Sequence, residues 1–220
     1  MNQARKRTTM QKVLSMILVL VMLLSLMSMS AFTMATNETG ASSSARNDFM
    51  RVFHLDCGRK YFSVAEIKSL IDTASAANYT HIELAVGNDS LRFLLDDMSV
   101  TVDGKTYASD DVKTQIHNGN VKYYDAGSVN ELSQSDMDAI IAYAQSKNIS
   151  IIPLINTPGH MDAILSAATS LTGVNCSAYD SVRTIDVANT TAVAFTQALL
   201  QKYINYFAGK GCGYFNMGAD

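Results

Sequence analysis

The sequence contains no tryptophan, two prolines and only three cysteines among 220 residues. None of the cysteines lies in a C-x-x-C pair. Cys57 ends a predicted strand, Cys212 begins another, and Cys176 lies in a loop. If these strands are parallel, Cys57 and Cys212 lie at opposite ends of the sheet and cannot form a disulfide. We therefore predict that the cysteines act as small buried hydrophobic residues.

Motifs that mark several common enzyme classes are also absent. There is no G-x-G-x-x-G after a strand, no G-x-x-x-x-G-K-[ST] and no G-x-S-x-G. The four histidines lack the spacing of metal ligands, so we predict no metal site. His54 and His81 lie inside predicted strands and are interpreted as hydrogen-bonded core residues, and His117 as a surface residue at a helix end.

The N-terminus has the layout of a secretory signal peptide, residues 1–35. Four basic residues precede or border an apolar run over 13–24, and Thr33-Met34-Ala35 offers a cleavage site. The run is short for a membrane span, and no stop-transfer segment follows it. We predict a secreted or cell-surface protein with no membrane contact beyond this peptide; the alternative is an uncleaved N-terminal anchor.

The charge balance excludes nucleic acid as a partner. The first 35 residues contain four basic and no acidic side chains, so the mature chain carries a net charge of −7 and has no basic run. Residues 36–49 form a polar, Ser-rich linker without periodicity. Long periodic apolar segments follow from residue 50, which excludes disorder there.

Four apolar segments have the pattern of strands and alternate with helical periodicity. Strands are predicted at 52–56, 81–86, 149–155 and 212–217; helices at 64–74, 109–118, 137–144, 162–171 and from a cap at Asn189; and a hairpin at 99–107. This order predicts a parallel sheet with crossover helices, in either a doubly wound sheet or a (β/α)8 TIM barrel. The barrel needs eight strands, and the chain ends on its fourth. We therefore expect residues 50–220 to be the N-terminal half of a truncated barrel.

Polar residues follow each predicted strand, where active sites of parallel α/β folds lie. They are Asp56, Gly58 and Arg59; Asn88, Asp89 and Arg92; Asn156 and His160; and Asp220. One such set is weak, but four together predict a polar active site.

These residues carry a family resemblance. The segments 55–63 (LDCGRKYFS), 156–160 (NTPGH) and 214–220 (YFNMGAD) resemble the L-D-x-x-R, D-x-P-G-H and G-x-D-E motifs of glycoside hydrolase family 20. Residues 87–98 with the following hairpin resemble an insertion of β-N-acetylhexosaminidases on Gram-positive cell surfaces. The resemblance spans residues 51–220.

The resemblance implies a (β/α)8 barrel that removes terminal β-linked N-acetylglucosamine or N-acetylgalactosamine from glycans with retention and without a cofactor. The 2-acetamido oxygen of the substrate would be the nucleophile. Asp220 would orient the acetamido group, and a Glu following it would be the general acid, held by His160. Arg59 would bind sugar hydroxyls; its alternative role is an ion pair with Asp56, and that of His160 is helix capping.

Several positions depart from the family pattern. Asn88 and Asp89 replace an acidic pair, so the carboxylate that orients His160 is Asp89 or absent. Asn156 stands where many relatives have Asp, and the missing tryptophans belong to later strands. Without the acid we expect the 220-residue chain itself to be inactive. The alternatives are a non-catalytic carbohydrate-binding relative and an unrelated aldolase-type barrel, for which no strand-end Lys or metal site is visible.

Overall fold

The computed structural model describes residues 49–123, 130–179 and 181–219. The predicted signal peptide, residues 36–48 of the predicted linker, and Asp220 lie outside the described residues. Within the described ranges, no helix has both the length and the apolar character needed to cross a membrane.

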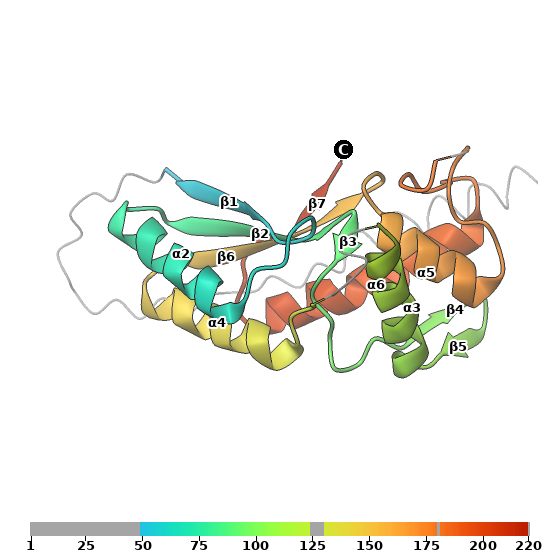
Figure 1. Ribbon diagram of the computed structural model, residues 1–220, viewed down its shortest axis with the longest axis horizontal. Coiled ribbons are helices and arrows are strands. Elements are labelled where there is room, and N and C mark those ends of the chain that lie inside the picture. Colours follow the sequence, from blue (N-terminus) through green and yellow to red (C-terminus); the bar gives the residue numbers. More distant parts are fainter. Residues whose placement is uncertain (1–48, 124–129, 180, 220) are drawn as a thin grey trace, which may run out of the picture. The chain divides into compact units, whose positions relative to one another are not determined.

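A parallel sheet forms the centre of the described structure (Figure 1). Its parallel strands, in spatial order, are β1 (Val52–Asp56), β2 (His81–Asn88), β6 (Ser150–Thr157) and β7 (Asn216–Gly218). The two-residue strand β3 (Ser90–Leu91) pairs antiparallel with β2. A separate hairpin joins β4 (Val100–Val102) to β5 (Lys105–Tyr107), as the Asp103-Gly104 turn predicts.

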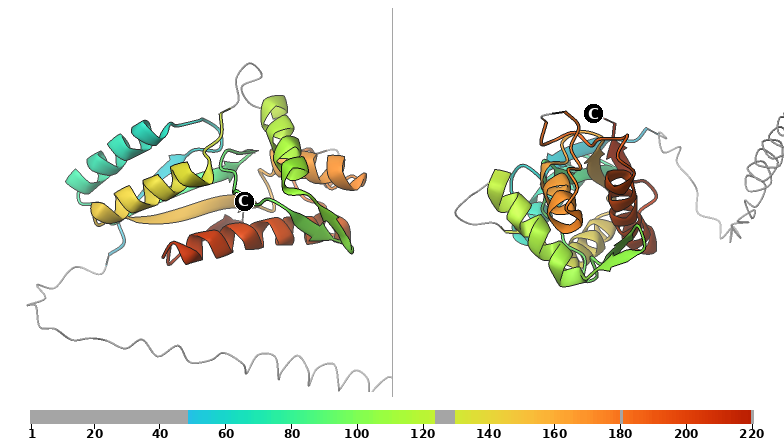
Figure 2. Two further views of the ribbon diagram at one scale, coloured as in Figure 1. Left: turned by 90° about the horizontal axis from the view of Figure 1, so that it is seen from below. Right: turned by 90° about the vertical axis from the view of Figure 1, so that its right-hand side faces the viewer.

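The helices form two groups (Figures 1 and 2). Those on one side of the sheet are α2 (Val64–Ala76), α4 (Gln134–Ser146) and α6 (Thr190–Gly209). The other two, α3 (Ser109–Tyr123) and α5 (Asp162–Thr172), pack against each other. Because α5 begins five residues after β6 ends, its N-terminus lies near the carboxyl end of that strand.

The predicted helix starts are confirmed at two positions. The Ser63 side chain accepts a hydrogen bond from the Glu66 N–H, and the Glu66 carboxylate accepts one from the Ser63 N–H, which completes a capping box. Asn189 accepts hydrogen bonds from the first turn of α6. These local contacts involve neighbours in sequence, which is why the pattern alone predicts them.

The strand order favours the predicted barrel over a doubly wound sheet. Consecutive parallel strands along the chain are neighbours in the sheet, with no reversal of order. A doubly wound sheet has such a reversal, and a barrel does not. Closure of the barrel and its number of units stay predictions.

The largest errors in the predicted boundaries are at the end of α3 and the start of β7. The helix expected to stop at Gly119 continues to Tyr123, because Gly119 lies against Ala163 of α5 and its missing side chain lets the two helices approach. The fourth strand is confined to Asn216–Gly218, because only this end of the predicted 212–217 strand pairs with β6.

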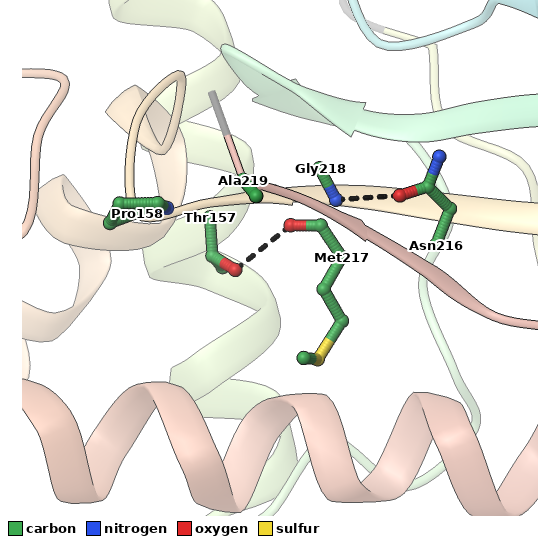
Figure 3. A pocket seen from close by; sticks show the side chains of 6 residues that line it. All are labelled: Thr157, Pro158, Asn216, Met217, Gly218 and Ala219. Atoms are coloured by element: carbon green, nitrogen blue, oxygen red, sulfur yellow. Dashed lines mark hydrogen bonds between the residues drawn. The ribbon is translucent and has the colours of Figure 1, made fainter.

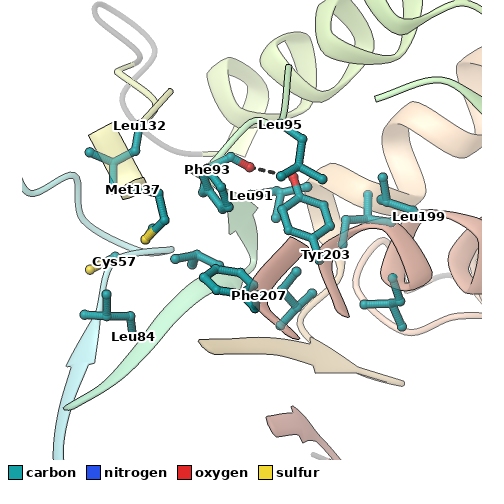
Figure 4. Packing of buried hydrophobic residues seen from close by; sticks show 14 of the residues in the cluster. Cys57, Leu84, Leu91, Phe93, Leu95, Leu132, Met137, Leu199, Tyr203 and Phe207 are labelled. Carbon is teal, nitrogen blue, oxygen red and sulfur yellow. Dashed lines mark hydrogen bonds between the residues drawn. The ribbon is translucent and has the colours of Figure 1, made fainter. Parts of the chain in front are cut away.

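The core lies between the sheet and the helices, and an aromatic cluster anchors α6 to it (Figure 4). The ring of Phe93 packs edge-on against Tyr203 and Phe207, with centroids 5.6 Å apart in each pair, and the Tyr203 hydroxyl donates to the Phe93 carbonyl. All three side chains are fully buried. This contact fixes α6 to the segment that follows β3.

The three cysteines are free; Cys57 and Cys176 are buried, as predicted, whereas Cys212 is only partly buried. Burial raises the pKa of the Cys57 thiol to about 12, which keeps it protonated and unreactive.

The prediction for His54 is wrong in one respect. Its side chain is half-exposed, although its Nδ1 lies 2.7 Å from a Glu83 carboxylate oxygen. His117 bonds Glu131 from within α3 and not from its end.

Candidate active site

The carboxyl ends of β1, β2 and β6 bring together six of the seven predicted site residues. They are Asp56 at the end of β1 and Arg59 after it, Asn88 at the end of β2 and Asp89 after it, and Asn156 near the end of β6 and His160 after it. The seventh, Asp220, lies outside the described residues. Parallel strands point their carboxyl ends toward the same edge, so segments distant in sequence meet there.

Asp56 builds the turn that presents Arg59. One carboxylate oxygen of Asp56 accepts hydrogen bonds from the backbone N–H groups of Gly58 (3.1 Å) and Arg59 (3.0 Å). Gly58 lies so close to β2 that a Cβ there would stand 2.5 Å from the Asn88 nitrogen. The buried Arg92 holds the same turn by donating from Nε to the Gly58 carbonyl (2.8 Å). Arg92 therefore stabilises, from its buried side, the turn that carries Arg59.

A chain of amides connects the ends of the three strands. Asn88 donates to the second oxygen of Asp56 (2.8 Å), and Asn156 donates to the amide oxygen of Asn88 (2.9 Å). Both asparagines are buried, so unpaired amides here would be destabilising. The two departures from the acidic family pattern thus form neutral hydrogen-bonded links between strands.

Arg59, Asp89 and His160 form a charged cluster. The Asp89 carboxylate accepts from Arg59 Nε at 2.9 Å, and its other oxygen lies 2.7 Å from His160 Nδ1. Asp89 is buried, whereas 46% of the Arg59 side chain and 21% of the His160 side chain are exposed. A fixed carboxylate therefore holds two side chains that reach toward solvent.

These contacts bear on the alternatives for Arg59 and His160. The predicted ion pair of Arg59 with Asp56 is present at 3.8 Å, and Asp89 is a closer partner at 2.9 Å; sugar binding by Arg59 stays a prediction. His160 does not cap α5, because the N-cap position is Met161 and no side chain caps that helix. Asp89 is the carboxylate that orients His160.

The proton on His160 can be placed from these distances. Arg59 Nη2 also lies 3.1 Å from Nδ1, but a guanidinium only donates, so this contact is not a hydrogen bond when Nδ1 carries a proton. The shorter contact to the Asp89 carboxylate requires a proton on Nδ1, since an unprotonated nitrogen would face a negative oxygen at 2.7 Å. In neutral His160, Nε2 is then the acceptor.

The backbone at Asp89 and His160 adopts the left-handed conformation, with φ of 62° and 53°. For residues other than glycine this conformation is uncommon and costs about 1–3 kcal/mol. Hydrogen bonds hold it in place: the Asp89 N–H donates to the His160 carbonyl at 2.7 Å, and the Ala163 N–H donates to the Asp89 carbonyl at 2.9 Å. The same conformation occurs at five other non-glycine residues of the described ranges, so it marks the tight turns at Asp89 and His160 and does not by itself identify a functional site.

A hollow of about 360 Å³ opens where β6 and β7 end (Figure 3). Its lining residues are Thr157, Pro158, Asn216, Met217, Gly218 and Ala219. The Thr157 hydroxyl donates to the Met217 carbonyl at 2.9 Å, which ties the two strand ends together. Asp220 directly follows this lining in sequence.

Sequence patterns missed one residue of the site, Asp162. It lies in the first turn of α5, is 1% exposed, and pairs with Arg183 at 3.4 Å. An acidic residue in a first helical turn is ordinarily a surface feature that the helix dipole explains. Only its burial distinguishes it, and burial depends on the tertiary structure.

No three His, Cys, Asp or Glu side chains in the described ranges are grouped so that they could hold a metal ion.

The chain matches the family description "Glycosyl hydrolase family 20, catalytic domain" over residues 49–220. The chain belongs to this family.

Solved structures of glycosyl hydrolase family 20 proteins show the same fold. Two structures of the pneumococcal protein StrH are 47% and 48% identical to this chain, with TM-scores of 0.75 and 0.74; each comparison covers 77% of this chain and 42% of the other. One is described as a study of N-glycan recognition and hydrolysis, and the other names StrH an exo-β-D-N-acetylglucosaminidase with tandem GH20 catalytic modules.

A curated relative is the lacto-N-biosidase of Bifidobacterium bifidum. It is 31% identical over 88 residues, which is 40% of this chain and 8% of the relative. The chain therefore spans less than half the length of these relatives.

Proposed function

We propose that this family 20 chain contributes the sugar-binding side of a retaining exo-β-N-acetylhexosaminidase, which removes terminal β-linked N-acetylglucosamine or N-acetylgalactosamine from glycans. The Arg59–Asp89–His160 cluster at the carboxyl edge of the sheet carries this proposal. The exo-β-D-N-acetylglucosaminidase activity named for StrH supports it. We also propose that the complete catalytic domain is a (β/α)8 barrel.

In the proposed reaction, Arg59 binds sugar hydroxyls through its forked guanidinium. Asp220 accepts a hydrogen bond from the acetamido N–H of the substrate, and the acetamido oxygen attacks the anomeric carbon. The glycosidic bond breaks, and its oxygen takes a proton from a Glu after Asp220 that His160 positions. Water then opens the oxazolinium ion, which restores the acetamido group and retains the configuration.

The requirement for the 2-acetamido group of the substrate provides a test of the proposed function. We expect the full-length protein to release nitrophenol from nitrophenyl N-acetyl-β-glucosaminide and to leave nitrophenyl β-glucoside essentially intact. Equal turnover of the two would contradict substrate-assisted catalysis. Binding of N-acetylglucosamine without turnover of either substrate would instead indicate a non-catalytic carbohydrate-binding protein.

We propose that the protein acts outside the cytoplasm, as a secreted or cell-surface enzyme. The N-terminal pattern over residues 1–35 supports this, because a basic segment, a short apolar run and small residues follow one another there. A glycan is then the expected partner.

A further inference from the structure

Asp162 is a buried acid that the proposed reaction does not use. One of its carboxyl oxygens, Oδ1, lies 3.4 Å from Arg183 Nη2. The other, Oδ2, is buried and has no hydrogen-bond partner among the described residues. A buried carboxylate oxygen without a donor is unfavourable by the cost of removing it from water, so the state of this oxygen requires an explanation.

The Asp89 side chain offers an explanation for the unpartnered Oδ2 of Asp162. The first turn of α5 is fixed to the Asp89 backbone, since the Ala163 N–H donates to the Asp89 carbonyl at 2.9 Å. Burial, the Asp89 charge and a hydrogen bond with the Asp89 side chain raise the pKa of Asp162. Two neighbouring ionised carboxylates repel, and a hydrogen bond between them forms only when one carries a proton.

The neighbouring charged groups determine which of the two carboxyls, Asp89 or Asp162, carries the proton. Asp89 faces two positive or proton-donating groups, Arg59 and His160, which favour its ionised form. Asp162 faces Asp89 and Arg183. Burial first, and then the Asp89 charge, raise the pKa of Asp162, and Arg183 opposes them.

We propose that Asp162 is a positioning residue: it carries a proton on Oδ2 and donates it in a hydrogen bond to Asp89, which in turn fixes His160 with its proton on Nδ1. Asp89 then has three partners, from Arg59, His160 and Asp162, and cannot rotate away from the histidine. No bond is made or broken in this arrangement. The catalytic consequence rests on the proposed function, but the arrangement of the three side chains does not.

Two substitutions of Asp162 distinguish the effect of its proton from the effect of its side-chain shape. In the full-length protein, Asp162→Asn keeps a donor toward Asp89 at every pH, and Asp162→Leu removes it. We expect D162N to keep kcat within about threefold, and D162L to lower kcat at least about tenfold with little change in KM, because a buried acceptor loses its donor. Asp72→Asn, which alters a surface carboxylate paired with Lys147, is the matched control and leaves activity unchanged.

A second measurement reports on the arrangement of Asp162, Asp89 and His160 independently of catalytic activity. In histidine-labelled full-length protein, nuclear magnetic resonance gives the tautomer of His160, with its signals identified by their loss in His160→Gln. We expect D162N to leave the Nδ1-protonated tautomer of His160 unchanged, because one neutral donor replaces another. D162L lowers the population of that tautomer, because Asp89 is then free to rotate away from the histidine.

The outcomes are distinguishable. If Asp162 is ionised in the folded protein, D162N introduces a donor toward Asp89 that the wild type lacks and changes the tautomer population of His160, which overturns the proposal. A D162L protein with unchanged kcat and an unchanged His160 tautomer also overturns it. A wild-type protein without hydrolase activity refutes the proposed function alone, since the His160 tautomer measurements still test the proton on Asp162.

Discussion

At the scale of single residues, Asp89 is the centre of the site. Its carboxylate contacts Arg59 and His160, and its backbone contacts the loop and helix that follow β6. These partners follow two separate strands, β1 and β6, so one buried residue after the end of β2 aligns groups from three strand ends. The left-handed backbone at Asp89, in the tight turn from β2 to β3, makes this possible.

Substitution of Asp89 measures its importance. We expect Asp89→Asn to lower kcat/KM of the full-length protein by about 100-fold or more, because His160 loses the carboxylate that fixes its proton. The assay is hydrolysis of nitrophenyl N-acetyl-β-glucosaminide, with Asp72→Asn as the control on a remote surface pair. Retention of activity within threefold would show that Asp89 serves folding only.

Asp162 also predicts a pH dependence of stability. Its pKa is raised in the folded state above the ordinary 3.8, so the folded protein binds its proton more tightly than the unfolded chain does. Its stabilising contribution is complete below about pH 3.8 and is lost as the pH rises through the raised value. Denaturant unfolding at several pH values should show D162N gaining stability relative to wild type as the pH rises; a constant difference would contradict this.

At the scale of elements, the contact between α3 and α5 supports the site from outside the sheet. Gly119 of α3 lies against Ala163, the residue whose N–H holds the Asp89 carbonyl. A Cβ on Gly119 would stand 2.8 Å from the Ala163 Cα, which is closer than such atoms approach. The spacing of these helices therefore affects the position of Asp89.

Two alanine substitutions test this contact. Gly119→Ala should lower the free energy of unfolding by about 1–3 kcal/mol, because the helices must separate. Gly209→Ala, at the end of α6 where a Cβ meets nothing within 4 Å, should instead leave it unchanged or raise it by about 0.4–1 kcal/mol. Chemical denaturation measures both, and equal effects would show that the α3–α5 contact is loose.

At the scale of the whole molecule, the sheet has two different faces. Helices α2, α4 and α6 cover one face (Figure 1), and buried apolar side chains fill the space between them and the sheet. On the other face, Glu83 joins His54 (2.7 Å) and Asn216 (2.7 Å) in a polar row across β1, β2 and β7. The predicted barrel would enclose this row, and a polar row inside a barrel needs such internal partners.

The N-terminal segment predicts the residue at which the mature protein begins. The protein recovered outside cells that express the full gene should begin at Thr36, after cleavage at Thr33-Met34-Ala35. N-terminal sequencing or intact mass measures this, with a protein lacking residues 1–35 as the control that stays inside the cell. A mature protein that begins at Met1 would indicate an uncleaved anchor.

Local patterns predicted much of this structure because local forces decide those parts. The capping box at Ser63, the Asn189 cap and the Asp103-Gly104 turn depend on neighbours within a few residues. The alternation of strands and helices likewise follows from periodic burial. The end of α3 was mispredicted because Gly119 interrupts the local pattern, whereas its contact with Ala163 is distant in sequence.

The sequence by itself determined the elements, the family and the residue types at each strand end. Only the tertiary structure decided which of those residues act together: that Asp89 is the partner of both Arg59 and His160, that Arg92 is a buried support, and that Asp162 belongs to the site. The physical reason is that hydrogen bonds and desolvation depend on distances between atoms. Separation along the chain does not encode those distances once parallel strands bring remote segments to one edge.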